Sequence, residues 1–158
     1  MSTHADALMI NQFLRISTAH TLREALGLLL YGEERKMNTG AIVVIDTEGE
    51  FAGLLTPEAL LRGFSKPEEG VRNYESFLAG VDEQLLETVE TVMEKDFPVL
   101  SPDTGLAEII KRMSQGKHEC LPVVENNRVS GLVYVTEVFK EAAGLALTPG
   151  EDGIQLDK

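Results

Sequence analysis

The sequence predicts a mixed α/β (α+β) fold made of two copies of one βαββα unit. When the chain is aligned with itself at a shift of 84 residues, Phe13 and Ser17 fall on Phe97 and Ser101. Further along, at a shift of 78, Gly53-Leu54 falls on Gly131-Leu132. Because the shift falls by six residues, the first copy is expected to contain an extra stretch between Tyr31 and Gly40. Such self-similarity indicates a repeat architecture, in which neighbouring units share a core.

The first copy is expected over residues 8–64. An extended piece at 13–17 leads to Thr21-Leu-Arg-Glu24, a capping box in which hydroxyl and carboxylate each satisfy an orphan amide. A helix from there ends near Gly32. The β-branched run at 41–45 and the segment 50–55 predict two strands joined by a hairpin. Thr56-Pro-Glu then begins a closing helix, with a hydroxyl N-cap and proline at the first position.

The second copy, expected over residues 91–143, follows the same order. An extended piece is predicted at 97–101, a helix at 106–116, a strand at 121–124, a second strand at 128–134 and a closing helix from Thr136. Between the copies, residues 65–90 form an acidic connecting segment, and apolar spacing predicts a helix over 82–95. The tail at 144–158 is expected to be disordered.

The charge of the chain excludes one class of partner. Its 158 residues carry a formal net charge of −12. This acidic balance is unsuited to binding nucleic acid. The carboxylates concentrate in residues 67–96, which is read either as a solvated helix face or as a docking surface for a basic partner. We expect no membrane association, since no apolar run approaches the length of a membrane span.

The compartment is expected to be the cytoplasm. The N-terminal segment has no basic region followed by a long apolar run, so no signal peptide is expected. Cys120 is a single cysteine and cannot form an internal disulfide, which suits a reducing environment.

The order of elements, twice repeated, resembles the tandem cystathionine-β-synthase (CBS) domain pair, or Bateman module. The likeness spans about residues 8–143 and rests on short motifs whose order and duplication make the match specific. The motifs are Ala41-Ile-Val-Val-Ile-Asp46, Gly53-Leu-Leu-Thr56, Phe97-Pro-Val-Leu-Ser-Pro-Asp-Thr-Gly-Leu106, Leu121-Pro-Val-Val124 and Gly131-Leu-Val133.

The resemblance implies two CBS repeats packed by their sheets with pseudo-twofold symmetry, usually assembled as a homodimer. It also implies a regulatory protein that binds an adenosine-type ligand (AMP, ADP, ATP or S-adenosylmethionine) in clefts between the repeats. Apolar residues on the closing helices are candidate dimer contacts, or else they cover their own sheets. These are Leu60, Leu61 and Phe64 in one copy and Val138, Phe139 and Ala142 in the other.

Both copies depart from the family's Gly-x-x-Ser/Thr-x-x-Asp motif. The first keeps Thr56 but has Ala59 in place of the aspartate, and Glu58 is one residue off, about 100° round a helix. The second has Tyr134 in place of the hydroxyl residue but keeps a carboxylate at Glu137. We therefore expect the second cleft to be the better ligand site.

In that cleft Glu137 would hold the ribose, Tyr134 would line the base, and Lys117 or His118 would meet a phosphate. Three candidates have a structural alternative: Glu137 as a favourable charge at a helix start, Tyr134 as a core aromatic, and Thr56, in the first copy, as an N-cap. By the resemblance the candidate ligand-binding residues are Thr56, Ser101, Thr104, Lys117, His118, Leu121, Pro122, Tyr134 and Glu137.

The leading hypothesis is a regulatory module that senses an adenosine-containing small molecule and signals to a separate, unknown protein partner. The alternative is a ligand-free dimeric interaction scaffold with degenerate clefts. No catalytic residues are identified, so no enzyme is expected. No metal is expected either, because His118-x-Cys120 supplies only two ligands and no second pair at zinc spacing.

Overall fold

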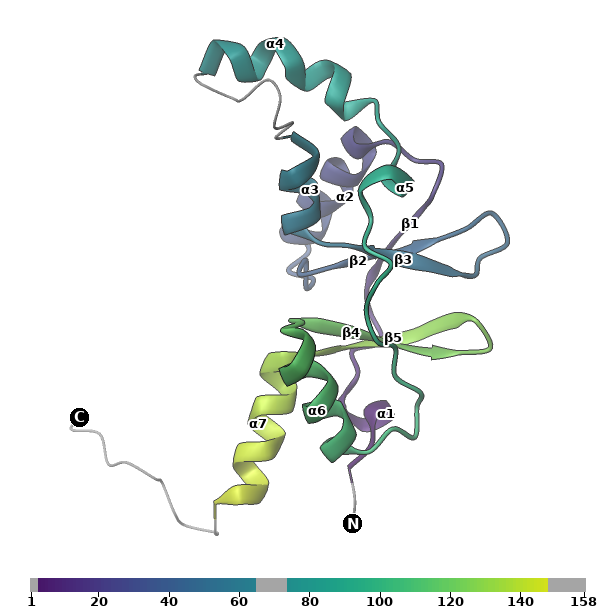
Figure 1. Cartoon of the computed structure of the whole chain (residues 1–158), viewed down its shortest axis with the longest axis vertical. Helices are drawn as coiled ribbons and strands as arrows, with labels where there is room; N and C mark the ends of the chain where they lie inside the picture. Colours follow the sequence, from purple (N-terminus) through teal and green to yellow (C-terminus); the bar gives the residue numbers. More distant parts are fainter. Residues whose placement is uncertain (1–2, 65–73, 148–158) are drawn as a thin grey trace, which may run out of the picture.

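The computed structural model describes residues 3–64 and 74–147 and confirms the mixed α/β fold (Figure 1). The first repeat contains β1 (Leu14–Ser17), α2 (Leu22–Glu34), β2 (Ile42–Ile45), β3 (Phe51–Leu55) and α3 (Pro57–Phe64). The second contains α6 (Leu106–Gly116), β4 (Cys120–Glu125), β5 (Arg128–Tyr134) and α7 (Val135–Ala146). The remaining elements are α1 (Ala5–Leu8), α4 (Tyr74–Leu85) and α5 (Val89–Val92).

The two sheets face each other across the middle of the molecule, and helices lie on their outer sides (Figure 1). In the first sheet β1 pairs with β2 in parallel and β2 with β3 antiparallel. The second sheet is the antiparallel β4–β5 pair. The strand predicted at 97–101 is reduced to one parallel bridge between Leu100 and Val123, with prolines on both sides of it removing donors that a ladder needs.

The helix predicted at 82–95 is wrong in extent. Helix α4 ends at Leu85, and the chain turns before the four-residue α5 begins at Val89. Thr88 is extended, with φ −79° and ψ 153°, and forms a bridge with Thr21. The periodic apolar residues continue through this region, but a contact with the first repeat ends the helix.

The short segment before each repeat in the sequence packs on the other repeat in the structure. Residues 4–10, which include α1, lie against the second repeat, where Ile10 bridges Leu132. Residues 88–94, which include α5, lie against the first repeat, where Glu94 bridges Leu54. The two segments correspond at the shift of 84, so the exchange follows the internal symmetry.

The buried residues form one cluster within each repeat and a third between the sheets. Ala5 belongs to the cluster of the second repeat and Val89 to that of the first, both with no exposed surface. The central cluster joins the two repeats and consists of Ala41, Val43, Leu54, Cys120, Leu132 and Tyr134. The exchange and the shared cluster therefore tie both halves into one packed body.

The hairpin turns of the two sheets are also joined. The amide of Phe51 donates to the Asn127 carbonyl at 2.7 Å. The Arg128 guanidinium donates to the carbonyls of Glu48 and Gly49 at 3.1 and 3.3 Å. These contacts hold the two sheets together at their hairpin turns, which lie at the opposite end from the starts of β2 and β4.

The structure divides the extra six residues between two places. Gly32 and Val44 are twelve positions apart, whereas the equivalent Gly116 and Val123 are seven apart, which puts five extra residues after α2. The sixth lies in the first hairpin, because Val44 pairs with Gly53 while Val123 pairs with Gly131.

Three further sequence-based expectations can be compared with the structure: the capping box, the absence of a membrane span and the C-terminal tail. The capping box is present, with the Glu24 amide donating to Thr21 Oγ1 and the Thr21 amide donating to Glu24 Oε1. Within the described ranges, no helix has the length and apolar character needed to cross a bilayer. The tail expected at 144–158 begins inside α7, and residues 148–158 lie outside the described part of the chain.

Candidate functional site

A cavity of about 390 Å³ lies between the two repeats, where β2 and β4 begin. The first repeat supplies the start of β2 and the β3–α3 connection, and the second supplies the residues before β4. Leu54, Leu61 and Phe97 contribute apolar surface, while Thr56, Glu58, Glu94, Lys117, His118 and Glu119 contribute polar groups; Gly40, Pro57 and Cys120 complete the lining.

Thr56 is positioned by its role at the start of α3. Its hydroxyl accepts from the Ala59 amide at 3.1 Å, which confirms the predicted N-cap. The same hydroxyl lies 3.5 Å from Glu94 Oε1 and lines the cavity. The two interpretations of Thr56 are therefore compatible, because one hydroxyl can cap a helix and still face a ligand.

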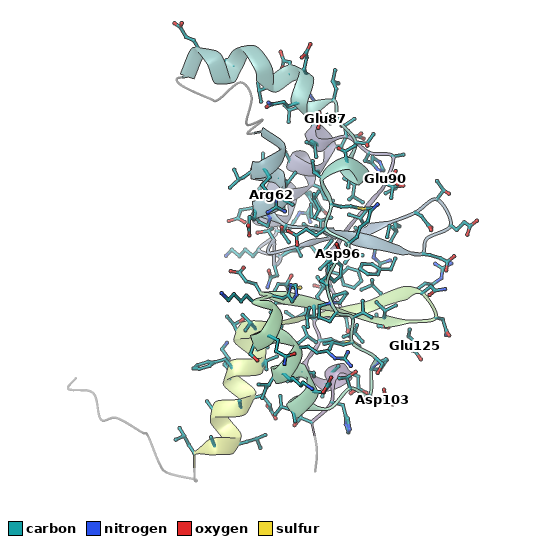
Figure 2. The ribbon with its side chains drawn as sticks, viewed as in Figure 1. Arg62, Glu87, Glu90, Asp96, Asp103 and Glu125 are labelled. Atoms are coloured by element: carbon teal, nitrogen blue, oxygen red, sulfur yellow. The ribbon has the colours of Figure 1, made fainter. Side chains whose placement is uncertain are left out.

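Three charged side chains form a network at the mouth of the cavity. Arg62 lies 2.8 Å from Glu94 and 3.1 Å from Glu58, both measured between guanidinium nitrogen and carboxylate oxygen. The hydrogen bond that Arg62 donates to Glu94 is the main cause that raises the pKa of Arg62. Figure 2 shows Arg62 projecting from α3 in the first repeat. Within this network Glu94 is the carboxylate that lies beside the Thr56 hydroxyl.

Glu94 is a candidate that the sequence motifs did not identify. It reaches the cavity because its backbone bridges Leu54, exchanging two hydrogen bonds of 2.8 and 3.0 Å. Ala59, which replaces the motif aspartate, is fully buried and supplies no polar group. Glu94 therefore supplies a carboxylate near Thr56 from a different segment. The one sequence signal for Glu94 is its place in the repeat alignment, where a charged residue stands opposite the apolar Ile10.

The structure brings three of the candidate residues together, namely Thr56, Lys117 and His118. Lys117 is the C-cap of α6 in a left-handed conformation, with φ 55°, and this turn carries both side chains to the cavity. Ordinarily only glycine or asparagine adopts that conformation readily. The short connection between α6 and β4 therefore puts two basic groups at the cleft.

The other candidates lie outside this cavity. Leu121 has no exposed surface and Pro122 is buried, so both belong to the core. Ser101 and Thr104 form an exposed turn before α6, in which the Ser101 amide donates to Thr104 Oγ1 at 2.9 Å. Glu137 pairs with Lys140 at 3.6 Å in the first turns of α7.

Tyr134, which was expected to line the base in the second cleft, packs between the two repeats. It is 7% exposed and belongs to the central cluster. A Cβ placed on Gly40 would lie 3.1 Å from Tyr134 Cε1, so the ring packs directly on the backbone at the start of β2. This packing favours the core-aromatic alternative for Tyr134.

Tyr134 and Cys120 form a buried pair without charge. Burial raises the pKa of the Cys120 thiol to about 12. Burial, followed by the nearby Cys120, raises the pKa of Tyr134 above its usual value. Among the described residues the Tyr134 hydroxyl makes no hydrogen bond of good geometry, and its polar neighbour is the Cys120 thiol, a weak hydrogen-bonding group. Both groups therefore stay protonated at neutral pH, and the hydroxyl is a buried polar group at a cost.

We expect Tyr134→Phe to stabilise the protein. The change keeps the ring on Gly40 and removes a buried hydroxyl that makes no hydrogen bond of good geometry; an unsatisfied buried group costs about 1–3 kcal/mol. Chemical denaturation should show a gain of about 1 kcal/mol. Tyr31→Phe, at a 47% exposed ring, is the matched control and should leave stability unchanged. A loss of stability in Tyr134→Phe would mean that the hydroxyl has a partner.

Two βαββα repeats that pack by their sheets, with a cavity between them, define a paired repeat module. A sequence model of the CBS domain matches residues 5–66 and 89–144, and the chain belongs to the CBS domain family. Members of this family commonly serve regulatory roles, nucleotide binding among them.

Several known proteins resemble the whole chain. It is 27% identical over 154 residues to the CBS domain-containing protein YhcV of Bacillus subtilis, covering 94% of both chains. A CBS domain-containing protein of unknown function from Bacillus anthracis has a TM-score of 0.73 at 21% identity, covering 90% of this chain and 94% of that one. These likenesses identify the fold.

A third relative was solved with a nucleotide. The cytosolic domain of the Mg²⁺ channel MgtE, in complex with ATP, has a TM-score of 0.68 at 22% identity and matches 87% of this chain. The present chain spans 48% of the length of that cytosolic domain.

Proposed function

We propose that this chain is a regulatory module that binds an adenosine-containing small molecule between its CBS repeats and signals to a separate protein. The cavity between the repeats carries the proposal, because it combines apolar surface with Thr56, Glu94, Lys117 and His118. Its volume of about 390 Å³ falls in the range of small-molecule sites. Known members of the family supply the expectation that the ligand contains adenosine.

The lining has the three parts that a nucleotide needs. The apolar side chains of Leu54, Leu61 and Phe97 suit the faces of a base. Glu94, beside Thr56, suits a ribose because its carboxylate accepts from hydroxyls. Lys117 and His118 suit a phosphate, whose oxygens accept charge-assisted hydrogen bonds. Glu119 opposes a phosphate nearby, so a ligand with few phosphates fits best.

The proposed ligand site differs from the one that motif spacing favoured. The motif carboxylate at Glu137 pointed to the second cleft, whereas the cavity gathers the basic residues with Thr56 at the first. The packing of Tyr134 between the repeats supports this choice. We therefore propose one ligand per chain, in the cavity of Thr56.

The signal requires two arrangements of the repeats. A ligand shifts an equilibrium only through different affinities for its two states. The cavity joins residues of both repeats, so a bound ligand favours whichever spacing fits it. We propose that the module is a cytoplasmic homodimer without catalytic activity, and that the acidic segment of residues 67–96 docks its protein partner.

Calorimetry and thermal denaturation with ATP, ADP, AMP, S-adenosylmethionine and, as control, GTP test the proposal. A ligand at 100 times its dissociation constant should add about 2.7 kcal/mol to the free energy of unfolding. Loss of one charged contact in Lys117→Gln should weaken the binding of a phosphate-bearing adenosine ligand about tenfold. Lys111→Gln, an exposed lysine on α6, should leave it unchanged.

Two further variants separate the clefts. Glu94→Gln should weaken every adenosine ligand, and Glu137→Gln should have no effect if the site is the cavity of Thr56. The reverse pattern would move the ligand to the second cleft. If no adenosine compound changes heat or melting temperature at millimolar concentration, the ligand-sensing proposal fails.

The Tyr134 side chain, packed between the repeats, also favours a second candidate function, a ligand-free dimeric scaffold that binds other proteins. Its ring packs on Gly40 and leaves the motif of the second repeat without a base site. If no adenosine compound binds the wild-type protein and light scattering shows a dimer, this alternative is supported.

A further inference from the structure

A second cavity, open to solvent and about 590 Å³ in volume, lies at the outer edge of the first repeat. It is formed where β1, an edge strand, meets the end of α2. Phe13, Arg15, Tyr31, Arg35 and Met37 are among its lining residues, and it shares none with the cavity between the repeats.

Two arginines in this cavity differ from the other four that the structure describes. Three of those four, Arg23, Arg62 and Arg112, pair with carboxylates, and the fourth, Arg128, donates to backbone carbonyls. Within the described ranges, Arg15 and Arg35 have no carboxylate within salt-bridge distance. In a chain with a net charge of −12, such unpaired arginines in one cavity are unusual.

Each of the two guanidinium groups lies over an aromatic ring. Arg15 Cζ is 4.7 Å from the Phe13 ring centroid, and Arg35 Cζ is 5.0 Å from that of Tyr31. A cation–π contact restrains the guanidinium but does not use its N–H donors. Two arginines are thereby held in place with their donors available, which favours binding of a planar or tetrahedral oxyanion.

The pocket belongs to the first repeat alone. Arg35 and Met37 lie in the five extra residues after α2 or next to them, and the second repeat passes directly from α6 to Lys117. At the shift of 84, Arg15 corresponds to Val99 and Tyr31 to Gln115. The insertion thus adds a basic pocket to an otherwise duplicated architecture.

We propose that Arg15 and Arg35 form a binding site for a small phosphate-bearing anion, separate from the cavity between the repeats. A phosphate can accept paired N–H donors from each guanidinium. The acidic surface of the chain repels extended polyanions, so a small molecule fits the site better than nucleic acid or an anionic membrane. The site occupies one repeat and does not depend on the proposed nucleotide function.

Calorimetry at constant ionic strength with inorganic phosphate, pyrophosphate and glycerol 3-phosphate tests the proposal and distinguishes free from esterified phosphate. At least one probe should bind saturably. The double variant Arg15→Gln/Arg35→Gln should weaken that binding at least tenfold. Arg23→Gln, which removes one positive charge from an exposed arginine on α2 outside the cavity, should change it less than twofold.

Backbone amide shifts locate the site. Phosphate probes should move the signals of residues 11–15 and 31–37 and leave those of 54–58 and 117–120 unchanged. ATP binding in the cavity of Thr56, where present, should survive in the double variant. The proposal is overturned if no probe binds saturably at millimolar concentration, if Arg23→Gln weakens binding as much as the double variant, or if the shifts occur only around Thr56.

Discussion

Gly53→Ala should destabilise the protein by about 3 kcal/mol, because the new methyl group has no room. A Cβ at this position would lie 2.7 Å from the Glu94 carbonyl oxygen and 3.0 Å from Met93 Sδ. The carbonyl is part of the two-bond bridge with Leu54, so it cannot retreat without breaking that bridge. In a chain of this size the loss corresponds to a fall of roughly 6–12 °C in melting temperature.

Gly131→Ala is the symmetry-related test and should cost less, about 2 kcal/mol. Its Cβ would meet Met9 at 2.8 Å and the Ile10 carbonyl at 2.9 Å, but the Met9 side chain is flexible and can move in part. Gly53→Ala should also weaken nucleotide binding, because the neighbouring bridge between Leu54 and Glu94 positions the Glu94 carboxylate. Gly131→Ala should not.

Gly27→Ala is the matched control for both glycine variants. Gly27 lies within α2, and a Cβ there would meet nothing within 4 Å. Alanine is favoured over glycine inside a helix by about 1 kcal/mol, so this variant should be slightly more stable. Denaturant titration of the three proteins decides the matter. Equal stability of Gly53→Ala and the wild type would refute the close approach of residues 93–94 to β3.

Local sequence signals predicted most of the fold. The capping box at Thr21 and both hairpins depend on residues close in sequence, and the structure contains them. The helix over 82–95 failed because Thr88 is held by Thr21, which is 67 positions away. A periodic apolar pattern does not record such a contact, because tertiary packing overrides local propensity.

The sequence predicted that the two leading segments are equivalent, but it did not predict that they are exchanged between the repeats. The repeat alignment matched Met9 with Met93, yet nothing in one copy indicates that its leading segment packs on the other. The glycines at 53 and 131 are the physical trace of this exchange, since each makes room for a methionine from the opposite leading segment.

The candidate site could be predicted in part. The positions of Thr56, Lys117 and His118 followed from the motifs, and the structure brings the three to one cavity. The place of Glu94 in the cavity depends on its bridge to Leu54, and the burial of Tyr134 depends on its contact with Gly40. Both are contacts between distant segments. Which cleft binds a ligand stays a prediction for the Glu94 and Glu137 variants.

Leu132→Ala should destabilise the whole chain by about 3–4 kcal/mol, as large-to-small changes in cores do. Leu132 has no exposed surface and packs in the central cluster between the sheets. Its backbone bonds to Ile10 do not involve the side chain, so the variant removes packing and leaves the segment exchange in place.

The form of the transition matters as much as its midpoint. Because the central cluster contains residues of both repeats, neither repeat can unfold without exposing part of the other's core. Leu132→Ala should therefore unfold in one cooperative step, with circular dichroism and tyrosine fluorescence giving the same midpoint. Leu30→Ala, at a 69% exposed side chain on α2, should change stability by less than about 0.5 kcal/mol. Two separate transitions, or a loss in Leu132→Ala as small as in Leu30→Ala, would mean that the repeats are independent domains and that the cavity between them lacks the rigid walls a ligand site requires.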